Sequence, residues 1–180
     1  MGGQRRVSGQ RCTVGQFCKI GQRHVSGHMM TFVTSSNLVE CAKSLDYRRL
    51  GKQRVEAYQI LRTLRKQSHG WKNHPAVRMW EGYEDALALY MNAMIDEWVA
   101  RGYKNTMNKE DVTSGASAKF PWWFYWKPLH DSHKAALNRK MPSEYTFEVD
   151  EVFMKHGYIW PHVLKSGMKI RCLCDVCDCI

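Results

Sequence analysis

The sequence predicts an all-α fold: a compact single-domain bundle of three to four helices joined by long loops. Apolar residues recur at spacings of three and four over two long runs, and no run alternates convincingly as a strand would. At 180 residues the chain is long enough for one domain with a real hydrophobic core and short for two.

The first two helices are predicted from their capping residues. "TSSN" precedes a short helix that we expect to run to about Ser44, and Asp46 can then cap a second, basic helix. The second helix carries an apolar face that we expect in the core. Its residues are Leu50, Ala57, Tyr58, Ile60, Leu61 and Leu64.

A long amphipathic helix is predicted next. "SHGWKNHP" interrupts the chain, and Pro75 suits a first helical turn, where a missing N–H costs nothing. The stepped apolar residues that follow predict one helix that stops near Gly102. They are Trp80, Tyr83, Leu87, Met91, Met94 and Trp98, and we assign both tryptophans to the core.

The chain after this helix is less regular. Residues 104–119 are polar and aperiodic, as expected of a functional or mobile loop. "FPWWFYWKP" then supplies aromatic rings, which either form core or offer a platform for unstacked bases; we favour core. These rings are Trp122, Trp123, Tyr125 and Trp126. A last helix is expected from about Leu129 to Lys140, ended by Pro142.

Both ends differ from this domain, which we place at residues 30–165. Residues 1–29 repeat a six-residue unit beginning with glycine, which we interpret as a disordered or non-native extension in preference to a hexapeptide β-helix. The tail, 166–180, contains "CLCDVCDC". Its four thiols could bind zinc or Cu(I), but their spacing is unlike a structural zinc site, so we assign no metal.

The charge favours polyanionic partners. Lys and Arg exceed Asp and Glu by ten, and five of the excess cations lie in residues 1–29. No apolar run approaches the roughly 20 residues that a membrane span requires, and the cysteines are not spread like a secreted disulfide framework. We expect an intracellular, cytoplasmic or nucleoid-associated monomer.

The strongest candidate site lies on the basic helix. Residues 45–66 contain seven Lys or Arg and two acids, and Arg49, Lys52 and Glu56 share one face, with Arg48 beside Lys52. One interpretation is a solvated face on which Glu56 only balances charge. The other is a phosphate-binding ridge around one catalytic carboxylate. His130 and His133 lack a third ligand nearby, so we expect polar surface there and no metal.

Several stretches resemble the pyrimidine dimer DNA glycosylase family of endonuclease V type, closest to its bacterial branch. They are "LDYRRLGKQRVEA", "HPAVRMWEGYEDAL", "DEWVARGY", "LHDSHKAALNRKMPSEY" and "YIWP". The resemblance implies a helical domain that bends damaged duplex DNA, cleaves the glycosidic bond of a pyrimidine dimer and then breaks the strand. It also implies that no metal or other cofactor is needed.

The resemblance assigns roles to particular residues. Met30 and Thr31 resemble the family's Met-Thr start, so Thr31 would be the nucleophile through its α-amine once Met30 is removed; a preceding peptide bond would abolish that amine's basicity. Arg49 stands where the family has its catalytic glutamate, and Glu56 is our hypothetical replacement. The resemblance implies DNA contacts by Arg48, Lys52, Arg139 and Lys140. We also expect DNA binding by Arg49, on the basic helix, and by His74, which resembles a family histidine before the long helix.

Two functions therefore stay open. The first is a DNA repair glycosylase and abasic-site lyase, an enzyme if the N-terminus is processed to Thr31. The second is a helical nucleic-acid-binding protein without catalysis, which Arg49 at the glutamate position favours. A third, a metal-sensing or partner-binding protein, would act through the cysteine tail.

Overall fold

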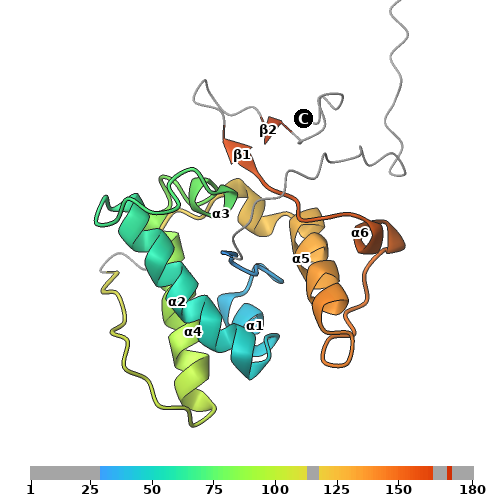
Figure 1. The fold of residues 1–180 in the computed structure, drawn as a ribbon, viewed down its shortest axis with the longest axis horizontal. Coiled ribbons are helices and arrows are strands. Elements are labelled where there is room, and N and C mark those ends of the chain that lie inside the picture. The colour runs from blue at the N-terminus through green and yellow to red at the C-terminus, as the bar shows by residue number, and fades with distance from the viewer. Residues whose placement is uncertain (1–28, 113–117, 164–169, 172–180) are drawn as a thin grey trace, which may run out of the picture.

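The computed structural model describes residues 29–112, 118–163 and 170–171, and within them the fold is helical, as predicted (Figure 1). The α-helices are α1 (Leu38–Lys43), α2 (Tyr47–Leu64), α3 (Pro75–Arg78), α4 (Glu84–Ala100), α5 (Lys127–Lys140) and α6 (Glu151–Lys155). A 3-10 helix, η1, spans Trp122–Tyr125. The antiparallel strands β1 (His162–Val163) and β2 (Ile170–Arg171) pair His162 with Arg171.

The predicted caps are confirmed. The Asn37 side chain accepts hydrogen bonds from the N–H groups of Val39 and Glu40 at the start of α1. Asp46 does the same for α2, accepting from Arg48 and Arg49 at 2.8 and 3.2 Å. α3 begins with Pro75 in its first turn.

The single long helix predicted from Trp80 is wrong. α3 ends at Arg78, a turn follows, and α4 begins only at Glu84. Gly82 in the turn has φ of +81°, a left-handed conformation that glycine adopts without strain. The apolar spacing continues across the turn, so periodicity alone did not indicate the break. With α3 and α6, there are also more helices in the described chain than the three or four predicted.

α2 and α4 form the centre of the fold. They pack along one another, α1 packs on α4, and α6 packs on α5. Gly51 on α2 allows the closest approach, because a Cβ atom there would lie 2.9 Å from the Trp98 ring of α4. The core includes the predicted Leu50, Ala57 and Leu61, which are at most 1 % exposed.

Several burial predictions need correction. Tyr58 is 40 % exposed, so it lies outside the core, and Trp98 is only partly buried against it. His130 and His133 are buried, contrary to the polar surface expected of them. Among the aromatic residues of 122–126, Trp123 is core, whereas Tyr125 is 63 % exposed.

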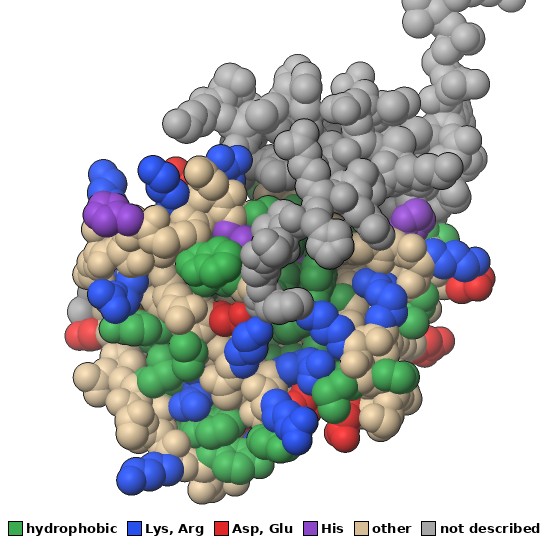
Figure 2. Space-filling model, viewed as in Figure 1, with side chains coloured by type: hydrophobic (Ala, Val, Ile, Leu, Met, Phe, Trp, Pro, Cys, Tyr) green, Lys and Arg blue, Asp and Glu red, His purple; other side chains and the backbone are tan. Residues whose placement is uncertain are grey.

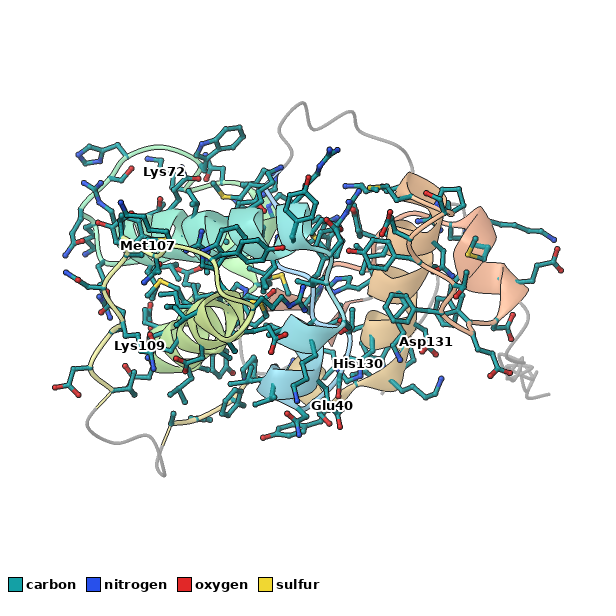
Figure 3. The ribbon with its side chains drawn as sticks, turned by 90° about the horizontal axis from the view of Figure 1, so that it is seen from below. Glu40, Lys72, Met107, Lys109, His130 and Asp131 are labelled. Atoms are coloured by element: carbon teal, nitrogen blue, oxygen red, sulfur yellow. The ribbon has the colours of Figure 1, made fainter. Side chains whose placement is uncertain are left out.

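The polar segment after α4 lies against the helices. Asn92 of α4 exchanges two hydrogen bonds with the backbone of Glu110, and the Glu110 carboxylate pairs with Arg65 at 2.7 Å. Lys109 pairs with Asp96 of α4. Figure 3 shows Met107 and Lys109 on this segment, where it runs beside α4.

The first described residues run through the middle of the domain. Figure 1 shows this N-terminal segment, residues 29–34, between α2 on one side and α5 on the other. The Phe32 N–H donates to Gln53 of α2, and the Val33 N–H donates to His133 Nδ1 of α5, each at 2.9 Å. The segment therefore joins the two halves of the fold through its backbone.

Candidate active site

Glu56 is the buried carboxylate of α2. Its residue is 5 % exposed, although it belongs to a strongly basic helix. Gln53 Nε2, one turn earlier, donates to Glu56 Oε2 at 2.8 Å, and Lys52 Nζ lies 3.3 Å from Oε1. Of the two interpretations open at the sequence level, a solvated Glu56 therefore disagrees with its burial.

The backbone of Met30 lies directly against this carboxylate. The Met30 N–H donates to Glu56, and the Met30 carbonyl accepts from Gln53 Nε2 at 2.7 Å. Thr31, the next residue, is fully buried, and its Oγ1 accepts from Trp80 Nε1 at 2.9 Å. Of the two residues that the sequence suggested as catalytic, Thr31 therefore directly follows the residue whose N–H binds Glu56. We call Gln53, Glu56, Lys52 and the Met30–Thr31 backbone the Glu56 site.

The proton affinity of Glu56 is set by competing effects. Burial raises its pKa, while the Lys52 ammonium, the Met30 N–H and the Lys140 ammonium act to lower it. Burial wins, so the carboxyl holds a proton to higher pH than an exposed glutamate does. A raised pKa is one of the conditions under which a carboxyl can act as a general acid.

Gln53 organises the site and was missed at the sequence level. It is 1 % exposed, and its Oε1 accepts from the Phe32 N–H and from the Tyr90 hydroxyl, the latter at 2.8 Å. Its amide therefore ties the N-terminal segment, α4 and Glu56 into one network. A signal existed, because Gln53 occupies the apolar face of α2, between Leu50 and Ala57.

Arg49 connects the beginning of α2 to the turn after α5. Its Nη1 lies 2.9 Å from Asp46 Oδ2 and 2.7 Å from Met141 Sδ, and its guanidinium covers the Tyr145 ring. Burial acts to raise the pKa of Asp46, but hydrogen bonds from Tyr145 and Arg49 prevail and lower it. Arg49 thus makes structural contacts at the position where the family resemblance expects a carboxylate.

Exposed cations occupy the helix that carries Glu56 and the end of α5. Arg48 and Lys52 are exposed on α2, and Arg139 and Lys140 are exposed at the end of α5. Figure 2 shows Lys and Arg side chains gathered on the face that these two helices share. Positive side chains at this density favour a phosphate backbone as ligand.

Tyr158 lies among these charges, after α6. Its ring packs 6.3 Å from Phe32 and 6.0 Å from His133, measured between ring centroids. Burial raises the pKa of its hydroxyl to about 12, with Arg139 opposing the shift, so the phenol is a neutral donor. That buried hydroxyl has no hydrogen-bond partner among the described residues.

The remaining predicted residues have structural contacts. Arg139 Nη1 donates to the carbonyls of Phe153 and Met154, which fastens α6 to α5. His74 is buried as the N-cap of α3, accepting from the Ala76 N–H at 3.1 Å, and its ring meets that of Trp160 edge-on. Their predicted DNA contacts stay predictions.

The two histidines of α5 are core residues. His130 Nε2 is 2.8 Å from the Phe124 carbonyl, and burial lowers the pKa of His130. His133 is fully buried, and burial lowers its pKa to about 3. Within the described part of the chain, no three His, Cys, Asp or Glu side chains lie close enough to hold a metal ion. The predicted cysteine tail lies outside the described side chains.

The fold and the site define a small helical domain in which a buried carboxylate lies beneath exposed cations, an arrangement suited to a nucleic-acid-modifying protein. Residues 29–111 match the family model of pyrimidine dimer DNA glycosylase, which confirms the resemblance over that segment. The match contains the Glu56 site and ends before α5. No curated protein and no solved structure matches the chain.

The match supports a role in DNA repair, with DNA as the substrate. The structure adds one negative finding: across the described residues, no helix has the length and apolar character needed to traverse a bilayer.

Proposed function

We propose that this protein is a DNA repair glycosylase with abasic-site lyase activity, acting on damaged duplex DNA at the Glu56 site. The observation that carries the proposal is the contact between the buried Glu56 carboxylate and the N–H of Met30, the residue before Thr31. In a chain that begins at Thr31, the Met30 N–H would be absent and a free α-amine would stand one residue further on, about 3.8 Å away between Cα atoms.

The chemistry follows from that amine. A terminal amine has a pKa of about 7.7 to 8.0, which leaves a reactive neutral fraction near pH 7. It attacks C1′ of the damaged nucleotide, the glycosidic bond breaks, and the base leaves with the bond's electron pair. The Glu56 carboxyl exchanges protons with the sugar and the leaving base. The sugar ring then opens as its ring oxygen takes up a proton, which leaves a protonated imine between the α-amine and C1′. Loss of the C2′ proton from this imine expels the 3′-phosphate and cleaves the strand, and water then releases the amine.

The cations and the lesion have separate roles in this proposal. Lys52 and Arg48 contact phosphates on either side of the damaged nucleotide, which positions the duplex without reading its sequence. A damaged or poorly paired nucleotide is the easiest to rotate out of the stack, and this preference supplies part of the selectivity. Met29 and Met30, both buried in the core, are removed with the N-terminal extension.

The test compares the full chain with a form that begins at Thr31. Each is incubated with ultraviolet-irradiated duplex DNA and borohydride, which reduces an imine to a stable amine and so traps a covalent adduct. We expect the Thr31 form to incise the irradiated duplex and to be trapped through its terminal amine. Salt-dependent DNA binding by both forms, without trapping or incision, would overturn the proposal and favour a non-catalytic DNA-binding protein.

A further inference from the structure

Lys140 is the last residue of α5. Its side chain is exposed at one end, yet its Nζ lies 5.5 Å from the centre of the Phe32 ring and 5.6 Å from that of Tyr158. Phe32 belongs to the same N-terminal segment as Thr31. The Lys140 amine therefore lies against two aromatic rings, one of which directly follows Thr31 in the chain.

The surroundings of Lys140 lower the pKa of its amine. Burial lowers its pKa, and the guanidinium groups of Arg49 and Arg139 lower it further, while Glu56 acts in the opposite direction. Partial removal from water and neighbouring cations are the two conditions that make a lysine nucleophilic. The Glu56 charge therefore also acts on this amine.

The other amines nearby have different environments. Lys52 is exposed and pairs with Glu56. Lys134, between one and two turns earlier on α5, lies 6.0 Å from the centre of the Phe147 ring. It is on the side of α5 where Asn138 donates a hydrogen bond to the Phe147 carbonyl. Lys140 differs from both, because two aromatic rings, two guanidinium groups and the Glu56 carboxylate all act on its amine.

We propose that Lys140 is a second nucleophilic amine, which forms an imine with the aldehyde of an abasic deoxyribose. The Lys140 nitrogen bonds to C1′ of the ring-opened sugar, and the aldehyde oxygen leaves as water. The protonated imine acidifies C2′; loss of that proton breaks the bond to the 3′-phosphate, and water then releases an unsaturated aldehyde.

This inference rests on the proposed function but differs from it in one property: the Lys140 amine does not depend on a free Thr31. The chain with its N-terminal extension should therefore retain lyase activity on a preformed abasic site, even where its α-amine chemistry at Thr31 is blocked by a peptide bond.

The experiment uses duplex DNA with one abasic site, the full chain, the Thr31 form, and each of them carrying Lys140→Arg. Arginine keeps the charge and the phosphate contact but forms no stable imine. The matched control is Lys134→Arg, which changes another lysine of the same helix that also lies over an aromatic ring. Borohydride-trapped adducts are counted on gels and located by peptide mapping, with DNA affinity and thermal unfolding measured on each variant.

We expect the full chain to be trapped at Lys140, Lys140→Arg to lower that trapping at least about tenfold with affinity changed less than about twofold, and Lys134→Arg to change neither. Trapping of the full chain at another residue, or unchanged trapping in Lys140→Arg, would overturn the inference. If only the Thr31 form is trapped, at its α-amine, the inference fails while the proposed function stands. If no form is trapped by or incises damaged DNA, both fail.

Discussion

The two sides of α2 are built differently. On the side of α4, the helices meet at Gly51 and Trp98, and the Arg54 guanidinium covers the Trp98 ring at 4.0 Å. On the side of the N-terminal segment, Gln53 and Glu56 bind backbone groups through hydrogen bonds. One side is close packing, and the other is a buried polar network.

The difference separates stability from chemistry. Adding or removing an atom at a close-packed contact lowers the stability of the fold, and such a contact contains no group that exchanges protons. A buried carboxylate is costly unless it is hydrogen-bonded, but its raised pKa makes it useful in catalysis. We therefore expect substitutions on the α4 side to change mainly unfolding, and substitutions at the Glu56 site to change mainly activity.

The largest effect is expected from Glu56→Gln. Glutamine keeps the shape and one acceptor but cannot exchange a proton, so trapping and incision by the Thr31 form should fall about 10²- to 10⁴-fold. The free energy of unfolding should change by about 1 kcal/mol or less, and DNA affinity should hold.

The control is Glu151→Gln, which removes the carboxylate of another (i, i+4) lysine pair, on exposed α6. It should leave activity unchanged. Equal activity in Glu56→Gln would return Glu56 to a purely structural role, and simultaneous loss of binding and folding would do the same.

The elements that the sequence predicted are those set by neighbours along the chain. Asn37, Asp46 and Pro75 cap or begin helices through atoms two or three residues away, so local chemistry identifies them. The apolar face of α2 is likewise a local pattern, although Tyr58, on an adjoining row, lies on the solvent side.

The environment of the site was not predictable, because it depends on distant contacts. Glu56 is buried by a segment more than 20 residues earlier, and His133 accepts from Val33 across 100 residues. Nothing near Lys140 in the sequence indicates that Phe32 and Tyr158 flank it. The local charge density is also typical of a solvated helix face. Only the packing of the N-terminal segment shows that Glu56 is withdrawn from water.

Leu61→Ala tests the packed face of α2. Leu61 is 1 % exposed, so truncation leaves a cavity and should lower the free energy of unfolding by about 2 to 5 kcal/mol. Urea denaturation measures that loss. Incision per folded molecule, measured at low temperature, should match that of the parent, and a selective loss of activity at full stability would contradict the division between the two sides.

The pH dependence of stability tests the α5 side of the N-terminal segment. Burial lowers the pKa of His133 to about 3, whereas the unfolded histidine titrates near 6.5, so only the unfolded state takes up this proton between these values. The contribution of His133 to the free energy of unfolding is fully present above about pH 6.5. It should fall as the pH drops towards 3, by about 1.4 kcal/mol per pH unit at most.

Denaturation at several pH values should show this slope, and His133→Gln should reduce it. The other groups facing His133 are Tyr158, which is neutral over this range, and His130, whose lowered pKa adds a slope of the same sign. An unchanged slope in His133→Gln would assign the acid sensitivity to other groups.

The smallest effect is expected from Gly51→Ala, which tests the close packing on the α4 side of α2. The new Cβ would lie 2.9 Å from Trp98 Cζ3 and 3.1 Å from Cη2, and the ring cannot withdraw freely, since its Nε1 donates to the Lys104 carbonyl and Arg54 covers it. Overpacking of this kind costs about 1 to 3 kcal/mol, while alanine gains about 1 kcal/mol over glycine within a helix. A net loss of about 1 kcal/mol in the free energy of unfolding should follow.

Gly157→Ala is the matched control, because a Cβ there meets nothing within 4 Å. A gain in stability for Gly51→Ala would show that the α4 side of α2 accommodates an added methyl group, and would contradict the close packing assigned to that side.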